Sequence, residues 1–148
     1  MANILLIDDD ELLRGALVQS LINAGHKVIE AADGRQGCEL ARSVPVDIVI
    51  TDLVMPVQEG VETILTLRRE RPKLPIIAMS GGVTNSGLYL DIAGKIGAKR
   101  MLPKPFMPKA LISLVQQILE EEAQRKAGDD GGQLKPRESM DGENQATR

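Results

Sequence analysis

The amino-acid sequence predicts an α/β fold in which five strands and five helices alternate along the chain and form a three-layer sandwich. Two observations favour this fold. Short apolar runs recur at five places, and the segments between them carry apolar residues at helical spacing. Right-handed crossovers between parallel strands would then place helices on both faces of one sheet. The 148 residues are enough for a domain that buries a sizeable core.

The first part of the chain predicts two strands and two helices. The run NILLID (3–8) is apolar at consecutive positions, as in strands that are covered on both faces. In 10–24 the apolar residues recur at three- and four-residue steps, which predicts a helix, and Gly25 is a typical helix stop. KVIEA (27–31) then predicts a second strand, and 34–43 a shorter helix.

The middle of the chain repeats this alternation. DIVITD (47–52) and PIIAMS (75–80) are again apolar at consecutive positions, which predicts two more buried parallel strands. The segment 60–70 lies between them. It ends with cations in its last turn and then meets Pro72, which is typical of a helix C-terminus.

The last elements follow the same order. The segment 86–96 predicts a helix that stops at Gly97, and KRMLP (99–103) predicts the fifth strand. MPKALISLVQQILEEEA (107–123) carries its apolar residues on one stripe and predicts the final helix.

The composition is that of a soluble globular protein, with 43% hydrophobic and 26% charged residues. We expect a folded domain over 1–123 and a disordered tail over 124–148, because the tail is too polar to offset its ordering entropy. The net charge of −3 disfavours a nucleic-acid partner. Neither a membrane span nor a signal peptide is evident, and the single Cys38 fits a reducing, cytoplasmic setting.

Chemically active side chains follow the predicted strands. Asp8 and Asp9 end the first, Asp52 ends the third, Ser80 ends the fourth, and Lys104 follows the fifth. In a parallel sheet of order 2-1-3-4-5, all of them would share one edge, at the point where the strand order reverses. Clustered carboxylates must bind a cation or take up protons, and oxygen ligands favour Mg²⁺ or Mn²⁺. With the lysine and the hydroxyl, they predict a pocket for a phosphoryl group.

LLIDDDELLR, VITDLVMPVQEG, IIAMSGG and LPKPF lie in an order and spacing that resemble the receiver domain of bacterial two-component response regulators, the CheY-like family. The resemblance covers about residues 3–122 and implies the flavodoxin-like strand order 2-1-3-4-5. It implies that Asp52 is the phosphoacceptor. Asp8 and Asp9 match the acidic pair that holds Mg²⁺, with Asp9 as direct ligand and Asp8 partly through water, and Val54 would ligate the metal through its backbone carbonyl.

The resemblance also assigns the remaining site residues. Ser80 matches the residue that hydrogen-bonds the phosphoryl oxygen, and Lys104 matches the lysine that pairs with the phosphoryl group. The Lys104–Pro105 bond would be cis. Met101 stands where the family usually carries a Tyr or Phe switch side chain. Met lacks the ring and hydroxyl but is flexible and can swing inward, so Ser80 and Met101 are the expected switch residues.

These matches lead us to expect a stand-alone receiver rather than an enzyme acting on other molecules. It would take a phosphoryl group from a sensor histidine kinase or a histidine phosphotransfer protein, which docks on the first helix. It would signal to an unknown target by protein contact or by passing the group on, as a monomer or weak dimer.

Other readings remain open at this level. The chain could be a receiver-like interaction module that is never phosphorylated, or a fragment of a larger regulator. It could also be a phosphatase with an aspartate nucleophile in the pair Asp8 and Asp10, although the sequence that should follow such a pair is missing.

Overall fold

The computed structural model describes residues 1–53, 60–81 and 86–133, with side chains left undescribed for 86–90 and 129–133. Five strands form one parallel sheet in the order β2-β1-β3-β4-β5, which confirms the predicted flavodoxin-like topology. The strands are β1 (Asn3–Ile7), β2 (Lys27–Ala31), β3 (Ile48–Asp52), β4 (Ile76–Ser80) and β5 (Arg100–Pro103).

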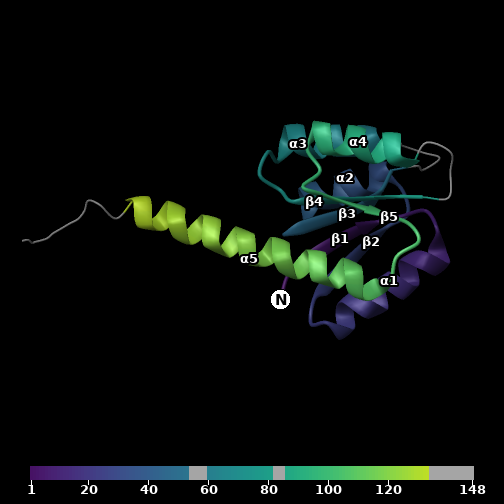
Figure 1. Cartoon of the computed structure of the whole chain (residues 1–148), viewed down its shortest axis with the longest axis horizontal. Helices are drawn as coiled ribbons and strands as arrows, with labels where there is room; N and C mark the ends of the chain where they lie inside the picture. The colour runs from purple at the N-terminus through teal and green to yellow at the C-terminus, as the bar shows by residue number, and fades with distance from the viewer. Residues whose placement is uncertain (54–59, 82–85, 134–148) are drawn as a thin grey trace, which may run out of the picture. The chain divides into compact units, whose positions relative to one another are not determined.

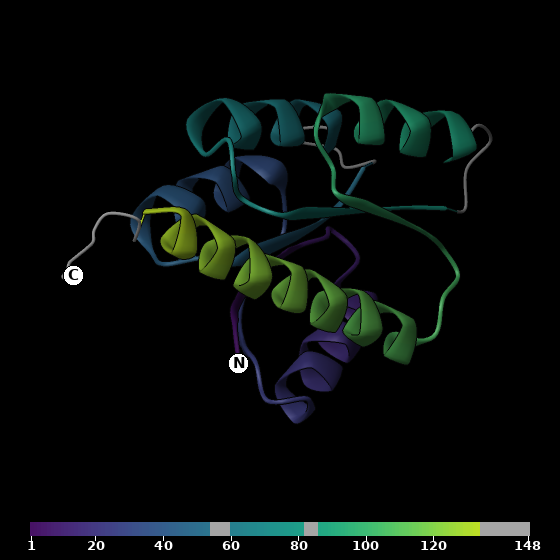
Figure 2. The ribbon, with the colours of Figure 1, turned by 60° about the vertical axis from the view of Figure 1, so that its left-hand side comes forward.

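The helices alternate with the strands and cover both faces of the sheet. Figures 1 and 2 show α2, α3 and α4 on one face, and α1 with the start of α5 on the other. The predicted three-layer sandwich is therefore confirmed. The helices are α1 (Glu11–Asn23), α2 (Gly34–Ser43), α3 (Gly60–Glu70), α4 (Ser86–Ile96) and α5 (Pro108–Gln133).

The core explains why the central strands are apolar at consecutive positions. All five residues of β3 and of β4 are buried, because successive side chains point to opposite faces and both faces carry helices. On one face, Leu5 and Ile7 of β1 belong to a buried cluster with residues of the facing helices. Those helix residues include Cys38, Ala41, Ile64, Leu67 and Ala93.

The last helix differs from its prediction. The expected end at residue 123 is wrong, because α5 continues to Gln133. Residues 124–127 are Gln, Arg, Lys and Ala, which favour helix by intrinsic propensity even where little surface is buried. An ion pair between Arg125 and Glu122, 2.9 Å long and three residues apart, supports the same turns. Of the predicted disordered tail over 124–148, the part after Gln133 lies outside the described residues.

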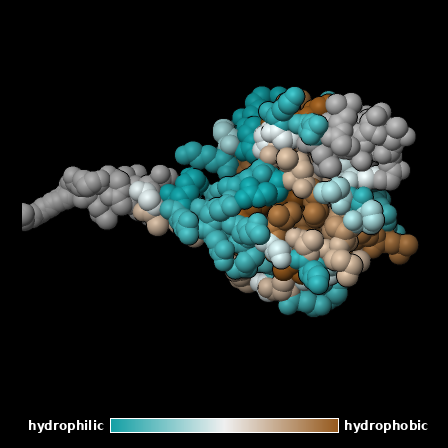
Figure 3. Space-filling model, viewed as in Figure 1, coloured by the Kyte–Doolittle hydropathy of each residue, from teal (hydrophilic) through white to brown (hydrophobic). Residues whose placement is uncertain are grey.

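The chain divides into two units, Met1–Val115 and Gln116–Arg148. The sheet, α1 to α4 and the first two turns of α5 all belong to the first unit. No helix in the described ranges has the length and apolar character that a bilayer crossing requires. Figure 3 shows hydrophilic groups along the left and lower parts of the face and hydrophobic groups at its centre and right.

Candidate functional site

Three carboxylates meet at the carboxyl edge of the sheet. Asp8 directly follows β1 and Asp52 ends β3, and these strands are neighbours in register, with Ile7 opposite Thr51. Carboxylate oxygens of Asp8, Asp9 and Asp52 all lie within 4.8 Å of one another. The chain leaves β1 towards β2 on one side and continues from β3 to β4 on the other, so the cluster lies where the strand order reverses.

Asp8 is fully buried, and every polar group it carries has a partner. Its backbone N–H donates to the carbonyl of Ala31 at 3.1 Å. Its carboxylate oxygens accept from the backbone N–H of Asp10 at 2.9 Å and from Nζ of Lys104 at 3.2 Å. Asp9, by contrast, is exposed. Neighbouring acids in the sequence therefore have different surroundings: one is held inside the edge and the other faces outward.

Asp10 starts the helix that follows. Its carboxylate accepts from the backbone N–H of Leu13 at 3.1 Å, and this caps the first turn of α1. The cap explains why the chain turns into a helix directly after the acidic pair. It also shows that Asp10 has a structural task, although it lies close to the cluster in sequence.

Asp52 is 7% exposed and has two neighbours that favour its charged form. The backbone N–H of Leu53 donates to its Oδ1 at 2.9 Å, and Nζ of Lys104 lies 3.5 Å from the same oxygen. Burial nevertheless raises the pKa of Asp52 from 3.8 to about 6, since desolvation outweighs the opposing effect of Lys104, and Asp8 adds a like charge. The surroundings of this carboxylate therefore supply too little positive charge to offset its burial. A bound cation would add that charge.

Lys104 reaches the cluster from the far side of the sheet edge. Its backbone N–H donates to the carbonyl of Ser80 at 2.8 Å, which continues the ladder between β4 and β5 beyond Pro103. The Lys104–Pro105 bond is cis, as predicted. From this position the ammonium group contacts the carboxylates of both Asp8 and Asp52.

Ser80 ends β4 and is completely buried. Its Oγ has no hydrogen-bond partner among the described residues. A buried hydroxyl without a partner costs free energy, so its presence at a site edge points to a ligand. The hydroxyl is available to donate to an oxygen that arrives at this edge.

The remaining predicted residues stand apart from the cluster. Val54 lies outside the described residues. Met101 is on β5 and is 41% exposed. Its terminal methyl, Cε, lies 3.1 Å from the point where a Cβ on Gly94 of α4 would stand, so the side chain lies against the helix where Gly94 leaves room.

One residue near the cluster was missed by sequence reasoning. Arg14 of α1 donates from Nη1 to the backbone carbonyl of Asp8 at 2.6 Å and from Nε to Glu30 at 3.0 Å. The only signal in the sequence is its place one turn after Asp10, which also suits an ordinary solvated helix residue.

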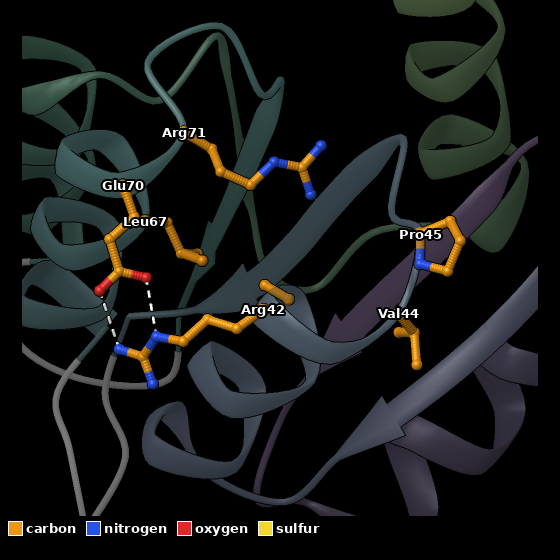
Figure 4. A pocket seen from close by; sticks show the side chains of 7 residues that line it. Arg42, Val44, Pro45, Leu67, Glu70 and Arg71 are labelled. Atoms are coloured by element: carbon orange, nitrogen blue, oxygen red, sulfur yellow. Dashed lines mark hydrogen bonds and ion pairs between the residues drawn. The ribbon is translucent and has the colours of Figure 1, made fainter.

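A separate surface pocket of about 470 Å³ lies between the C-terminal ends of α2 and α3 (Figure 4). Glu70 of α3 accepts two hydrogen bonds of 2.9 Å from Arg42 of α2 across it. The helices α2 and α3 end at the edge of the sheet opposite to the carboxylates. None of the predicted site residues lines this pocket. Its lining residues are Ala41, Arg42, Val44, Pro45, Leu67, Glu70 and Arg71.

The donor set of the cluster suits a hard divalent cation. Three carboxylates supply oxygen, and no histidine or cysteine takes part. A Mg²⁺ ion binds through one or two carboxylates and keeps waters and phosphate oxygens as its other ligands. The raised pKa of Asp52 fits a cation at this edge, and the Ser80 hydroxyl, which has no partner within the described part of the chain, fits a phosphoryl group there.

Comparison with known proteins agrees with this fold. Residues 4–116 match the family described as the response regulator receiver domain. The chain belongs to this family, whose members are signalling modules of two-component systems.

Curated relatives carry the same domain within longer proteins. The transcriptional regulator NtrC of Azospirillum brasilense is 36% identical over 80% of this chain and 24% of its own length. The sensor kinase CckA of Brucella abortus is 34% identical over 82% of this chain and 13% of its own. CpxR of Escherichia coli is 35% identical over 80% of this chain and 50% of its own. The chain thus spans at most half the length of these three relatives.

Solved structures show the same architecture. The chemotaxis response regulator CheY4 of Vibrio cholerae is 32% identical, with a TM-score of 0.72 over 80% of this chain and 98% of that one. A CheY-like receiver domain protein of Methanospirillum hungatei shares the fold with a TM-score of 0.79 at 23% identity, over 84% of this chain and 98% of its own.

Proposed function

We propose that this protein accepts a phosphoryl group on Asp52 from a phosphohistidine of a sensor kinase or histidine phosphotransfer protein, with Mg²⁺ bound at the acidic cluster. The observation that carries this proposal is the meeting of three carboxylates within 4.8 Å beside the ammonium group of Lys104. An ionised Asp52 oxygen attacks phosphorus, the bond from phosphorus to the histidine nitrogen breaks, and an aspartyl phosphate forms.

The two acids after β1 take different parts. Both carboxylate oxygens of Asp8 are already engaged, by the Asp10 N–H and by Lys104, so we assign it to orient water around the ion. Exposed Asp9 and the buried oxygens of Asp52 are assigned as direct ligands, with the Val54 carbonyl as a further one. Mg²⁺, when bound, neutralises charge on the phosphoryl oxygens.

Lys104 and Ser80 serve the phosphoryl group itself. Nζ of Lys104 lies 3.5 Å from the attacking carboxylate and supplies positive charge for the oxygens that develop negative charge during transfer. The Ser80 hydroxyl, which has no partner among the described residues, donates to one of these oxygens in the product. This new bond changes the environment at the end of β4.

The signal would leave through the surface formed by α4 and β5. Met101 is part of this surface: it pairs with Ala78, two residues before Ser80 on β4, and its side chain lies against Gly94 of α4. We assign Met101 as the residue that reports phosphorylation to a partner protein, which binds by contact or takes the phosphoryl group on. The protein would work in the cytoplasm as a monomer or weak dimer.

The test is incubation with a small phosphoryl donor and Mg²⁺, followed by intact mass and peptide mapping. We expect one added phosphoryl group on the peptide that contains Asp52, lost in Asp52→Asn and absent with a chelator. Asp47→Asn serves as a matched control, because this exposed carboxylate lies at the opposite end of β3 and accepts from Asn3. Phosphorylation of the Asp52→Asn variant, or none of the wild type with any donor, would reject the proposal.

No observation favours a second function. A phosphatase that uses Asp8 as nucleophile would need this carboxylate to be accessible to a substrate, and Asp8 is fully buried. Its acid would be Asp10, whose side chain caps α1 instead. Phosphate found on the peptide that contains Asp8 would nevertheless revive this alternative.

A further inference from the structure

We propose that Arg14 is a positioning residue for the acidic cluster. Its guanidinium holds the peptide group between Asp8 and Asp9, and so sets where these two carboxylates stand towards Mg²⁺. This inference rests on the proposed function of the cluster as a magnesium site.

Arg14 contacts the peptide group that joins Asp8 and Asp9. Arg14 lies in the first turns of α1, and its side chain is 13% exposed. Nη1 donates to the Asp8 carbonyl at 2.6 Å, and Nε donates to Oε1 of Glu30 on β2 at 3.0 Å. The guanidinium is planar and rigid, so one donor cannot turn without moving the other.

The Asp8 carbonyl belongs to the same planar peptide unit as the Asp9 N–H. A hydrogen bond to that carbonyl therefore fixes the plane from which Asp9 departs. The backbone N–H of Asp8 is bound to Ala31 on β2 at 3.1 Å. Asp8 is thus held from both sides, whereas Asp9 is exposed and depends on this peptide plane for its place.

Glu30 holds the guanidinium from the other side. It lies on β2 in register with Leu6 of β1, and its side chain is 48% exposed. An ion pair with that exposure adds little to folding stability. Its effect is on geometry. Glu30 holds Nε of Arg14, and this fixes the guanidinium so that Nη1 points at the Asp8 carbonyl.

The direction in which Mg²⁺ affinity changes when Arg14 is replaced distinguishes a positioning role from a purely electrostatic one. Arg14 is a cation beside a cation site. If it acted only through its charge, its removal would tighten Mg²⁺ binding by lowering repulsion. If it positions the acidic pair, its removal weakens Mg²⁺ binding despite the lost repulsion.

The experiment measures Mg²⁺ affinity of the full chain by calorimetry and follows the amide signals of Asp8, Asp9 and Asp10 by NMR. For Arg14→Gln we expect affinity to fall roughly tenfold, the usual effect of losing an outer support of metal ligands. Arg14→Lys keeps the charge but loses the planar guanidinium, and Glu30→Gln weakens the hold on the guanidinium. The Mg²⁺ affinity of both variants should therefore lie between those of the wild type and Arg14→Gln. Arg69→Gln removes an exposed cation at the far end of α3 and should match the wild type.

Equal or tighter Mg²⁺ binding by folded Arg14→Gln overturns the positioning role, whatever the Asp9 signals show, while the magnesium site stands. If Arg14→Gln does not fold, Glu30→Gln and Arg14→Lys decide by the same measure. A wild-type protein that binds no Mg²⁺ overturns the proposed function and this inference together, so the two failures are distinguishable.

Discussion

The ammonium nitrogen of Lys104 lies 3.2 Å from a carboxylate oxygen of Asp8, although 96 residues separate them in the sequence. The same nitrogen lies 3.5 Å from Oδ1 of Asp52. One cation therefore stands between two buried carboxylates and weakens their repulsion without cancelling it. The pKa of Asp52 remains raised, to about 6, because its desolvation exceeds the attraction of Lys104. This imbalance leads to the first prediction.

Replacing Asp52 by Asn should stabilise the metal-free protein at neutral pH. A carboxyl whose pKa rises from 3.8 to about 6 on folding contributes stability below pH 3.8 and loses it as pH rises through 6. The neutral amide escapes this loss. We expect a gain of about 2–3 kcal/mol at neutral pH, measured by urea unfolding with a chelator present.

The gain should shrink at acid pH, where Asp52 is protonated in the wild type. It should also shrink with Mg²⁺, which stabilises the wild type by binding its folded state. A gain that does not depend on pH would instead mean that the ionisation of Asp52 is not its source.

Replacing Gly60 by Ala should destabilise the fold next to the site. A Cβ at this first residue of α3 would lie 2.2 Å from the carbonyl oxygen of Asp52 and 2.4 Å from Cα of Leu53. These are backbone atoms, so relief requires the end of β3 to move. We expect a loss of about 2–4 kcal/mol in the free energy of unfolding, together with slower phosphorylation.

Gly15→Ala is the matched control, because Gly15 lies within α1 and nothing stands within 4 Å of its added Cβ. It should leave stability unchanged or raise it by up to about 1 kcal/mol through helix propensity. Equal stability of the two variants would contradict the close approach of Gly60 to β3.

His26 should make stability depend on pH. Burial lowers the pKa of His26 below 6.5, and the nearby N-terminal ammonium lowers it further. Its neutral Nδ1 accepts from the backbone N–H of Ala2 at 3.2 Å, at the start of β1. A pKa that is lower in the folded state means that this contribution is full above pH 6.5 and is lost as pH falls through the folded value.

The measurement compares urea unfolding of the wild type and His26→Gln from neutral pH downwards. Wild type should be the more stable at neutral pH, and the difference should narrow as pH falls below 6.5. An NMR titration of the ring gives the folded pKa directly. A difference that widens on acidification would show the opposite sign.

Met101 should respond to its contact with Gly94. In Gly94→Ala the added Cβ would stand 3.1 Å from Cε of Met101 and 3.4 Å from Sδ, so the flexible side chain must move. We expect a changed Met101 methyl signal in methyl-labelled protein, and a second change when Asp52 is phosphorylated. The methyl of Met107, which is 64% exposed on the β5–α5 loop, is the internal reference. An unmoved Met101 signal on phosphorylation would remove it as the reporting residue.

Much of the fold could be predicted because local patterns of apolar residues indicate its strands and helices. Consecutive apolar residues in 47–52 and 75–80 reflect helices on both faces, and the structure buries all of β3 and β4. The carboxyl ends of parallel strands share an edge, so acids after the first and third runs could be expected to meet. The length of α5 differs from its prediction, because the polar composition after residue 123 predicts disorder whereas Gln, Arg, Lys and Ala at 124–127 favour helix.

Local sequence patterns were enough to predict the alternation of elements, the strand ends that carry acids, and the residue types that suit Mg²⁺ and a phosphoryl group. They could not predict that Asp8 is buried with both oxygens engaged while Asp9 is exposed, because this depends on the packed chain. The raised pKa of Asp52 and the hydrogen bond from Arg14 to the Asp8 carbonyl also depend on the tertiary structure. The physical reason is that desolvation and hydrogen bonds between distant residues belong to the packed chain, because they depend on distances that no local pattern contains.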